Sequence, residues 1–356
     1  MSLIKVNNRG QQDNLGRRNL VINGAMFVAQ RGSTTINGAE SYGQVDRFKG
    51  YGIAGGQFSL AQSTDAPAGF ARSLIATVTS ADSSIASGDY YGISHRIEGH
   101  NVARLNYGTS NARTTTLSFY VKSSLTGTFG GAIRNSAANR SFNFSYTINS
   151  ANTWERKSYT IIGDQTGTWL SGGGIGIRVT FSVGDGSARL ASAGSWNAGN
   201  YAGVTGQTNL ISTGSATLQL TGVQLEEGTI MTDFEHLPFP QYWLDSIRYY
   251  YNSNLGSNGP GVVSYGRDAQ YAMIRPVQVT FPVIMRGTPT VVIQSGSANS
   301  MDRYGRGQET CYPQAEGIND KGFDVIRSRD SGGNNRDWTD NGLYMNRAGY
   351  SADAEL

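Results

Sequence analysis

The chain is poor in the residues that most other architectures require. Its 356 residues include one cysteine, Cys311, together with 8 prolines and three histidines. A single cysteine excludes an intrachain disulfide framework. No apolar run approaches the roughly 20 residues of a membrane-spanning helix. Only 15% of the residues are charged, and long windows lack the apolar period of a helix. These absences predict an all-β protein.

Excess charge is confined to the first residues. Residues 1–18 contain one acidic residue, Asp13, and four basic ones, Lys5, Arg9, Arg17 and Arg18. The remaining 25 basic and 25 acidic residues of the totals of 29 and 26 balance each other. A neutral body argues against a nucleic-acid surface. We therefore interpret 1–18 as a short basic arm and expect no nucleic-acid partner and no membrane insertion.

Glycine is abundant, with 47 residues among short apolar runs, and it has no three-residue period. Such spacing excludes collagen and is typical of tight turns between strands. Within the runs, apolar residues alternate with polar ones, as in "TLSFYVKS" and "IGIRVTFSV". A period of two indicates antiparallel strands with one buried face. Many such strands between residues 19 and 236 predict a two-sheet sandwich.

The later part of the chain divides into a connector and a second domain. "HLPFPQYWLDSIRYYYNS" interrupts the strand pattern with Pro238 and Pro240, and Tyr242–Tyr251 could form a short helix. We predict a connector over 237–251 and a smaller distal β-domain over 252–356. The distal domain contains two long polar stretches that resemble loops, "DRYGRGQETCYPQAEGINDKG" and "RSRDSGGNNRDWTDNG".

Scattered motifs resemble those of bacteriophage virion proteins, chiefly tail-fibre and related adhesin proteins. They are "RRNLVINGAMFVAQRGS", "VDRFKGYG", "RTTTLSFYVKSS", "NTWERKSYTIIGDQTGTW", "TGVQLEEGTIMTDFEHLPFPQYWLDSIRYYYNS", "VTFPVIMRGTPTVVI" and "ADAEL". The resemblance implies a jelly-roll domain similar to carbohydrate-binding modules, followed by a smaller β-sandwich domain. It also implies a structural protein that assembles as a homotrimer with other virion proteins.

The resemblance also raises the question of a calcium ion. Family-like modules often hold a structural calcium near the first strand, through an acidic residue after an "NGxF"-like turn. Here the turn is Asn23-Gly24-Ala25-Met26-Phe27, and no acidic residue follows it. We therefore expect no cofactor, with structural calcium as the doubtful exception.

Catalytic and metal-binding patterns are weak. His95 and His100 lie five residues apart, so on a strand they would point to opposite faces, which argues against zinc. A glycosidase needs two carboxylates across a sugar. The candidates are Asp164, Asp185, Glu226 and Glu227, and nothing in the sequence places two of them opposite each other. We expect no enzyme.

Aromatic residues in polar loops are better candidates. Sugars stack on aromatic faces while amide, acidic and guanidinium groups bind their hydroxyls. The candidate glycan-binding residues are Trp169, Trp196, Asn197, Asn200 and Tyr201, with Asn335, Arg336, Asp337 and Trp338 in the distal domain. Each tryptophan could instead cover the edge of the sandwich.

The sequence therefore predicts a virion structural protein that attaches phage to host surface polysaccharide. The basic arm, through Lys5, Arg9, Arg17 and Arg18, would attach the protein to the particle. A protein of this kind is made in the host cytoplasm and released by lysis. A decoration or connector protein without receptor binding is the alternative, and a polysaccharide-cleaving enzyme is a lower one.

The segment Gln30–Gly52 is predicted to be structural. It leads from the first strand into the sheet, with Phe48 directed into the core and Asp46 and Arg47 paired at the domain edge. On this interpretation the segment contributes nothing to receptor binding.

Overall fold

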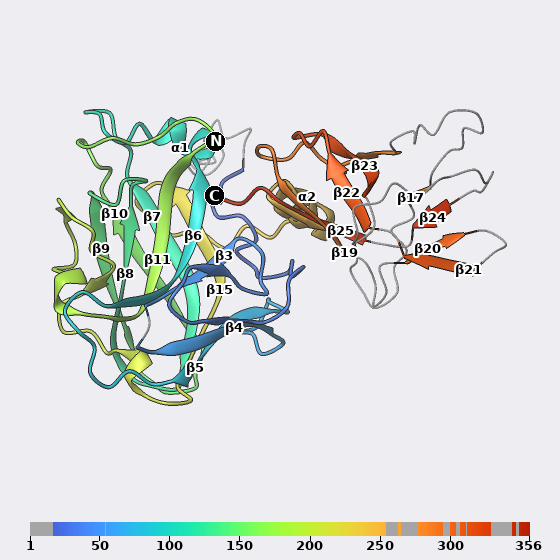
Figure 1. Ribbon diagram of the computed structural model, residues 1–356. Coiled ribbons are helices and arrows are strands. Elements are labelled where there is room, and N and C mark those ends of the chain that lie inside the picture. The colour runs from blue at the N-terminus through green and yellow to red at the C-terminus, as the bar shows by residue number, and fades with distance from the viewer. Residues whose placement is uncertain are drawn as a thin grey trace, which may run out of the picture.

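The chain folds into a large β-sandwich joined through a short helix to a smaller β-rich unit (Figure 1). The computed structural model describes residues 17–53, 55–253, 263–264, 277–294, 300–303, 307–310, 312–328, 344–346 and 349–356. In Figure 1 the chain returns from the smaller unit and ends against the sandwich. No helix among the described residues is long and apolar enough to cross a membrane.

Two antiparallel sheets form the sandwich. The six-stranded sheet has the order β1 (Thr34–Ile36), β4 (Gln57–Ser63), β5 (Ser73–Ser80), β15 (Thr217–Glu227), β7 (Thr115–Ser123) and β10 (Glu155–Ile161). The seven-stranded sheet has the order β13 (Trp196–Asn197), β9 (Ser141–Ile148), β8 (Gly127–Arg134), β11 (Ile175–Asp185), β6 (Tyr90–Glu98), β3 (Phe48–Tyr51) and β2 (Ser41–Tyr42). From β5 to β11 the chain passes repeatedly between the two sheets. This is the predicted jelly roll.

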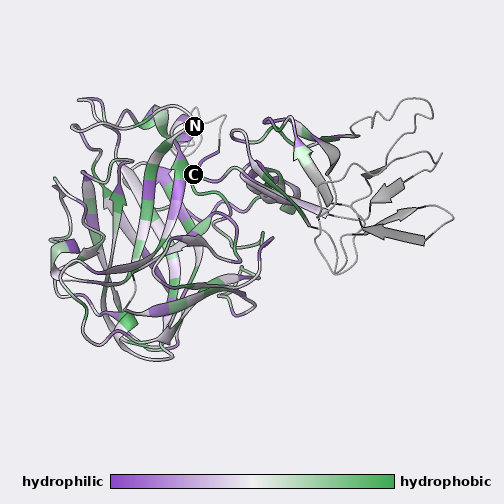
Figure 2. Ribbon diagram, viewed as in Figure 1, coloured by the Kyte–Doolittle hydropathy of each residue, from purple (hydrophilic) through white to green (hydrophobic). Residues whose placement is uncertain are grey.

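Alternating apolar residues close the sandwich. Hydrophobic and hydrophilic residues follow one another along the strands of the sandwich (Figure 2). Leu117, Phe119 and Val121 of β7 are buried, as their period of two predicts. On β11, Val179 and Phe181 are buried as well, and the rings of Phe119 and Phe181 meet edge to face at 4.9 Å. Strand contacts across both sheets therefore form one apolar core, whose burial is the main stabilising term of the domain.

Short elements cover the ends of the sandwich. Helix α1 (Gly99–Val102) and a 3-10 turn (Ala103–Leu105) follow β6, and two further 3-10 turns span Ser187–Arg189 and Leu210–Ser212. Between these two turns, β12 (Leu190–Ala191) pairs in parallel with β14 (Gly203–Val204). The segment 186–208 thereby forms an ordered flap rather than an open loop.

Small sheets build the second unit. The three sheets are β16 (Tyr250–Asn252), β25 (Gly349–Asp353) and β19 (Thr290–Gln294); β17 (Val263–Ser264), β24 (Tyr344–Asn346), β20 (Ser300–Arg303) and β21 (Gly307–Thr310); and β18 (Val277–Thr280), β23 (Gly322–Ser328) and β22 (Tyr312–Glu316). Phe281, Phe323 and Tyr350 are buried together, with the last two rings 4.9 Å apart. The second unit thus has a core of its own.

Helix α2 (Phe239–Ile247) is the predicted helix at the junction, but it lies earlier than Tyr242–Tyr251. Pro240 stands in its first turn, where a missing N–H costs no intrahelical hydrogen bond. The helix ends before the tyrosine run because Tyr250 and Tyr251 pair with β25. It buries Tyr242, Ser246 and Ile247.

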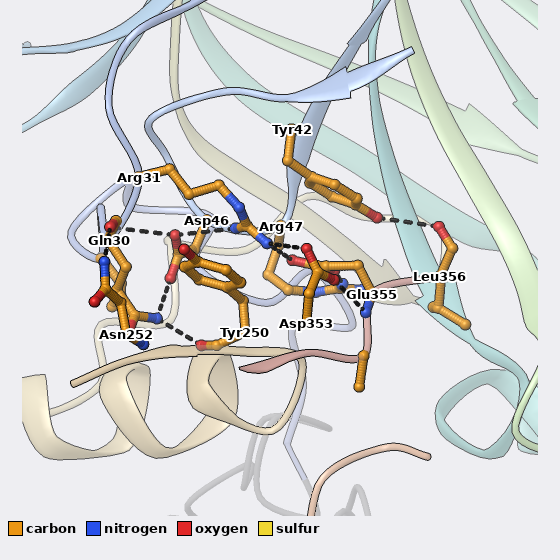
Figure 3. A network of polar contacts seen from close by, with 12 residues as sticks. Gln30, Arg31, Tyr42, Asp46, Arg47, Tyr250, Asn252, Asp353, Glu355 and Leu356 are labelled. Atoms are coloured by element: carbon orange, nitrogen blue, oxygen red, sulfur yellow. Dashed lines mark hydrogen bonds and ion pairs between the residues drawn. The ribbon is translucent and has the colours of Figure 1, made fainter. Parts of the chain in front are cut away.

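The closing residues fasten the second unit to the jelly roll (Figure 3). The guanidinium of Arg47, which is fully buried, forms an ion pair with Glu355 and donates to the carbonyl of Arg96 at 2.6 Å. It also lies over the ring of Tyr249, 3.6 Å from the centroid. The hydroxyl of Tyr42 donates to the carbonyl of Leu356. These contacts join the closing residues 355–356 to the jelly roll.

Asp46 and Arg47 therefore do not pair with each other at the domain edge, and that expectation was wrong. Both are buried, and Asp46 pairs with Arg31 at 3.4 Å while Arg47 pairs with Glu355. Arg47 has a φ of 72°, the left-handed region that most residues avoid. This turn directs the guanidinium toward the second unit and Phe48 into the core, as predicted for Phe48.

We expect Glu355→Ala to lower the free energy of unfolding by about 3 kcal/mol, because it leaves the buried guanidinium of Arg47 without its counter-ion. Urea denaturation followed by fluorescence measures the change. The matched control is Asp233→Ala, since the Asp233 side chain is 98% exposed in its pair with Arg156. The control should lose less than about 0.5 kcal/mol. Equal losses in the two variants would contradict the role given to the buried pair.

Candidate functional site

Three arginines lie side by side across the seven-stranded sheet. The register places Arg178 of β11 opposite Arg96 of β6 and opposite Arg134 of β8 (Figure 1). Ile177 and Val179 point into the core, so Arg178 projects from the outer face. Like charges directly opposite each other destabilise a sheet. A row of three arginines therefore lowers the stability of the sheet, which makes this face a candidate for a functional site.

The flap 186–208 covers part of this face and leaves a basin at its margin. Asn143 of β9 donates to the carbonyl of Gly203 at 2.8 Å, and Ser141 donates to that of Gly199 at 3.0 Å. The uncovered part is a cavity of about 90 Å³. Its lining residues are Glu40, Tyr51, Tyr90, Arg134, Ala138, Arg178, Arg189, Asn200 and Ala202. We call this cavity the basin.

Hydrogen bonds fix the arginines of the basin in place. Arg134 donates to Asn200 Oδ1 at 2.6 Å and to Thr180 Oγ1 at 3.1 Å. Arg178 donates to the carbonyl of Ser136 at 2.9 Å. These acceptors are neutral, so they orient the guanidinium groups without neutralising them. The Nε atoms of Arg134 and Arg178 are buried and have no hydrogen-bond partner.

Two tyrosines form the aromatic side of the basin. The rings of Tyr51 and Tyr90 lie 5.7 Å apart, and the guanidinium of Arg189 lies 4.9 Å from the ring centre of Tyr90. Tyr51 is 4% exposed, yet its hydroxyl has no hydrogen-bond partner. Burial raises the pKa of Tyr51, so the hydroxyl stays protonated and can donate a hydrogen bond to a ligand.

Two carboxylates lie beside the basin, and both are engaged. Partial burial alone would raise the pKa of Glu40, but hydrogen bonds and charges from Lys49 and Arg96 outweigh it and hold that pKa below its usual value. Asp185 is buried beneath the flap and accepts from Ser182 and Gln207. Burial raises the pKa of Asp185 to about 7, against the effect of these hydrogen bonds.

The pKa of Arg178 is lowered by its burial and by the positive charges of Arg96 and Arg134 nearby.

A larger cavity, of about 710 Å³, lies between α2, the α1 segment and residues 17–22. Its charged side chains are paired within the chain: Arg17 with Asp245, Arg248 with Glu98 at 3.2 Å, and Arg104 with Glu227 at 3.9 Å. We interpret it as the crevice of the junction, because its charges already have partners.

The comparisons with known proteins gave structural likenesses alone. No family model and no curated protein matches the sequence. Similar structures include the enzymatically active domain of tailspike protein 4 from bacteriophage CBA120, at 13% identity and a TM-score of 0.33. That match covers 59% of this chain and 21% of the tailspike chain. The chain thus spans about a fifth of that protein.

Other similar structures are described as sugar-binding proteins. A putative sugar binding protein from Bacteroides thetaiotaomicron matches at 11% identity and a TM-score of 0.34, covering 59% of this chain and all of its own. The family 11 carbohydrate-binding module from Clostridium thermocellum matches at 12% and 0.27, covering 58% of this chain and 98% of its own. At these TM-scores and identities the likenesses support no conclusion about function.

The structure places the predicted Trp169 and Trp196 at the edge of the sandwich. Trp169 and Trp196 meet Tyr107 edge to face, at 5.0 and 5.9 Å. The indole N–H of Trp196 donates to the carbonyl of Ile162 at 2.6 Å, and that of Trp169 donates to the carbonyl of Thr166 at 3.2 Å. Both rings thus pack against the core, and neither lines the basin.

Of the other predicted residues in that loop, Asn200 reaches the basin, where it accepts from Arg134. Asn197 donates to Asn143 Oδ1 and to the carbonyl of Ser195 and so helps to hold the flap. Tyr201 is half-buried in the flap. The distal candidates Asn335, Arg336, Asp337 and Trp338 lie outside the described residues.

The predicted attachment residues are described in part. Arg17 pairs with Asp245 of α2, and Arg18 donates to the carbonyl of Asp233 at 2.8 Å. Both therefore fasten residues 17–18 to the chain itself. Lys5 and Arg9 lie outside the described residues. Attachment of the arm to a particle stays a prediction.

The turn after Asn23 does not fit a calcium ion. Asn23 uses its side chain on the backbone, accepting from Val28 N–H at 3.0 Å and donating to the carbonyls of Val28 and Asp46. The carboxylate that comes near, Asp46, accepts from Gln30 and is paired with Arg31. A guanidinium thus serves as its cation. Within the described ranges, no cluster of three His, Cys, Asp or Glu side chains could hold a metal.

The four carboxylates considered for catalysis lie with partners of their own. Arg140 forms a two-pronged pair with Asp164 at 2.7 and 2.8 Å, and Arg113 binds Glu227 at 2.5 Å. Glu226 accepts from Thr232, and Asp185 from Ser182. Asp185, whose pKa is raised to about 7 by burial, lies beneath the flap.

Neither the arginine row nor the contribution of Gln30–Gly52, which supplies Glu40 and Tyr51 to the basin, was predicted from the sequence. A signal existed: "HRI", "IRV" and "IRN" each place an arginine beside an apolar residue of a strand, hence on the polar face. The alternation gave the face of each arginine, but not the register that aligns the three.

We expect Asp185→Asn to remove a pH dependence of stability. An acid with a raised folded pKa contributes stability below its unfolded pKa, near 3.8, and that contribution is lost as pH rises to about 7. From pH 5 to pH 8 the wild type should lose on the order of 2 kcal/mol relative to the variant, which imitates the protonated acid. Urea titrations of both proteins at the two pH values measure this. Equal losses of unfolding free energy in the wild type and the variant between pH 5 and pH 8 would contradict the raised pKa of Asp185.

Proposed function

We propose that this protein binds carbohydrate through the basin and that it does so as a bacteriophage virion adhesion protein, in a tail fibre or head fibre. The observation behind the first part is the pairing of two tyrosine rings with fixed donors on the outer face of a jelly-roll sheet. Tyrosine rings pack against sugar C–H groups, and guanidinium and amide groups bind hydroxyl oxygens.

The basin is a preformed site, because its donors are already oriented before a ligand binds. The donors of Arg134 and Arg178 are held by backbone and side-chain acceptors, and the flap is hydrogen-bonded to β9. A preformed site loses less entropy when a ligand binds. The unsatisfied hydroxyl of Tyr51 gains a partner only when a ligand or water enters the basin.

The virion assignment is supported by the sequence motifs that resemble tail-fibre proteins, which lie in the jelly roll, the junction and the second unit. Binding in such a protein is noncovalent, and a trimer would multiply weak sites by raising the effective concentration of the second and third contacts. The site would lie on the body of the jelly roll, in addition to any contact made by the distal unit.

A decoration or connector protein without receptor binding is the second candidate, because the same polar faces could contact neighbouring virion subunits. It predicts no glycan binding and normal phage adsorption after the basin is altered. A polysaccharide-cleaving enzyme predicts polymer shortening that depends on one carboxylate, and Asp185 is the first to change, since its pKa is raised to about 7.

We expect Tyr90→Ala to weaken binding to an array of bacterial surface polysaccharides at least tenfold, about 1.4 kcal/mol, through loss of a stacking face. The matched control is Tyr120→Ala. Tyr120 is also half-buried, and its ring lies 5.7 Å from an arginine, Arg156, but on the six-stranded sheet. Binding that is equally weak in both variants, or unchanged in Tyr90→Ala, would contradict the site.

The trimer is tested separately. Mass photometry of the full chain at micromolar concentration should show a species of three chains, about 115 kDa from the 38.2 kDa of one. A monomer under these conditions, with glycan binding intact, would remove the multivalent part of the proposal and leave the basin unaffected.

A further inference from the structure

The basin has an excess of positive charge that the chain does not neutralise. Three arginines line it, Arg134, Arg178 and Arg189, and among the described residues none of them forms an ion pair with a carboxylate. Their acceptors are amide, hydroxyl and carbonyl oxygens. Arg96, the fourth arginine on this face, differs because it pairs with Glu40 at 2.5 Å.

The two nearby carboxylates do not compensate for this charge. Glu40 lines the basin but is shared between Lys49, at 2.7 Å, and Arg96. Asp185 lies beneath the flap, and its raised pKa leaves it partly protonated near neutral pH. Arg178 also faces Arg96 and Arg134 directly across the strands. The face is therefore cationic at the point where the flap stops covering it.

The unsatisfied groups of the basin are donors. The Nε–H groups of Arg134 and Arg178 are buried without partners, and a guanidinium can only donate. The hydroxyl of Tyr51, which is 4% exposed, is likewise free to donate. A ligand group that satisfies these donors must be rich in acceptor oxygens and poor in hydrogens. An oxyanion meets this condition, and a sugar hydroxyl meets it less well.

The size of the cavity indicates which part of the ligand enters. At about 90 Å³ it is well below the roughly 300 Å³ at which pockets begin to enclose a whole small molecule. It can accept one substituent of a sugar, while the ring itself lies against Tyr90 at the margin.

We propose that the basin selects acidic polysaccharides, by binding the carboxylate or sulfate of one sugar residue between Arg134, Arg178 and the hydroxyl of Tyr51. This inference rests on the proposed glycan binding and narrows it to anionic chains. The two uncompensated arginines of the row, which the free protein tolerates at a cost in stability, are then the anion-binding groups of the site.

The experiment uses the full chain and matched polymer pairs in affinity electrophoresis. Polygalacturonate and its carboxyl-reduced derivative differ only in the carboxylate, and dextran sulfate and dextran differ only in the sulfate. We expect binding of at least one anionic polymer, at least tenfold tighter than binding of its neutral counterpart. The preferred pair then identifies the oxyanion as carboxylate or sulfate.

Arg178→Gln tests the residue. It should weaken binding of the anionic polymer at least tenfold, and by a larger factor than it weakens binding of the neutral one. Its melting temperature should be equal to or above that of the wild type, since a like-charge neighbour is removed. The control Arg156→Gln, on β10 of the other sheet, removes the same charge where the native arginine binds Thr232 and Asp233. It should leave binding unchanged.

The failures can be told apart. Binding of neutral polymers that equals or exceeds that of the anionic ones, with Tyr90→Ala still weakening it, would overturn the anionic selectivity and preserve the glycan site. Equal losses in Arg178→Gln and Arg156→Gln would show attraction to net charge alone and would also overturn the inference. Absence of binding to every polymer of either kind would overturn the proposed function together with it.

Discussion

The buried ion pair between Arg47 and Glu355 is the constraint on which the arrangement of the two units depends. Arg47 has no access to solvent, so its charge must be met inside the protein, and the acid that meets it lies next to the last residue of the chain. A buried charge without a partner would cost several kcal/mol. The sequence must therefore return from the second unit to the jelly roll, which places β25 beside β16 and α2 against the sandwich.

The same junction influences the candidate site. Arg96 begins the arginine row, but its guanidinium donates to the carbonyl of Leu356 and pairs with Glu40, so the junction and the rim of the basin share it. Among the described residues, Arg178 and Arg134 form no ion pair with an acid. Docking of the second unit thus divides one row of like charges into an end that is paired at the junction and an end whose hydrogen-bond acceptors are all neutral.

Prediction from the sequence succeeded where the information is local. The period of two in "TLSFYVKS" depends only on which face of one strand is buried, and Leu117, Phe119 and Val121 are buried as expected. The helix was placed too late because Tyr250 and Tyr251 lie at helical spacing from Ile247 but pair with a strand just over 100 residues away. Trp196 was chosen for its polar loop, and its ring instead turns inward beside Phe142, at 5.4 Å.

The sequence by itself determined the all-β class, the two-sheet sandwich, the short helix at the junction and the direction of Phe48, because alternation, proline positions and turn residues act over a few neighbours. The tertiary structure alone decided which arginines meet and which acids reach them. Arg96, Arg134 and Arg178 are spread over 83 positions of the chain, and only the register of β6, β8 and β11 brings them together. Whether a charged side chain meets an opposite charge depends on residues that are distant in the sequence, and no local sequence pattern predicts it.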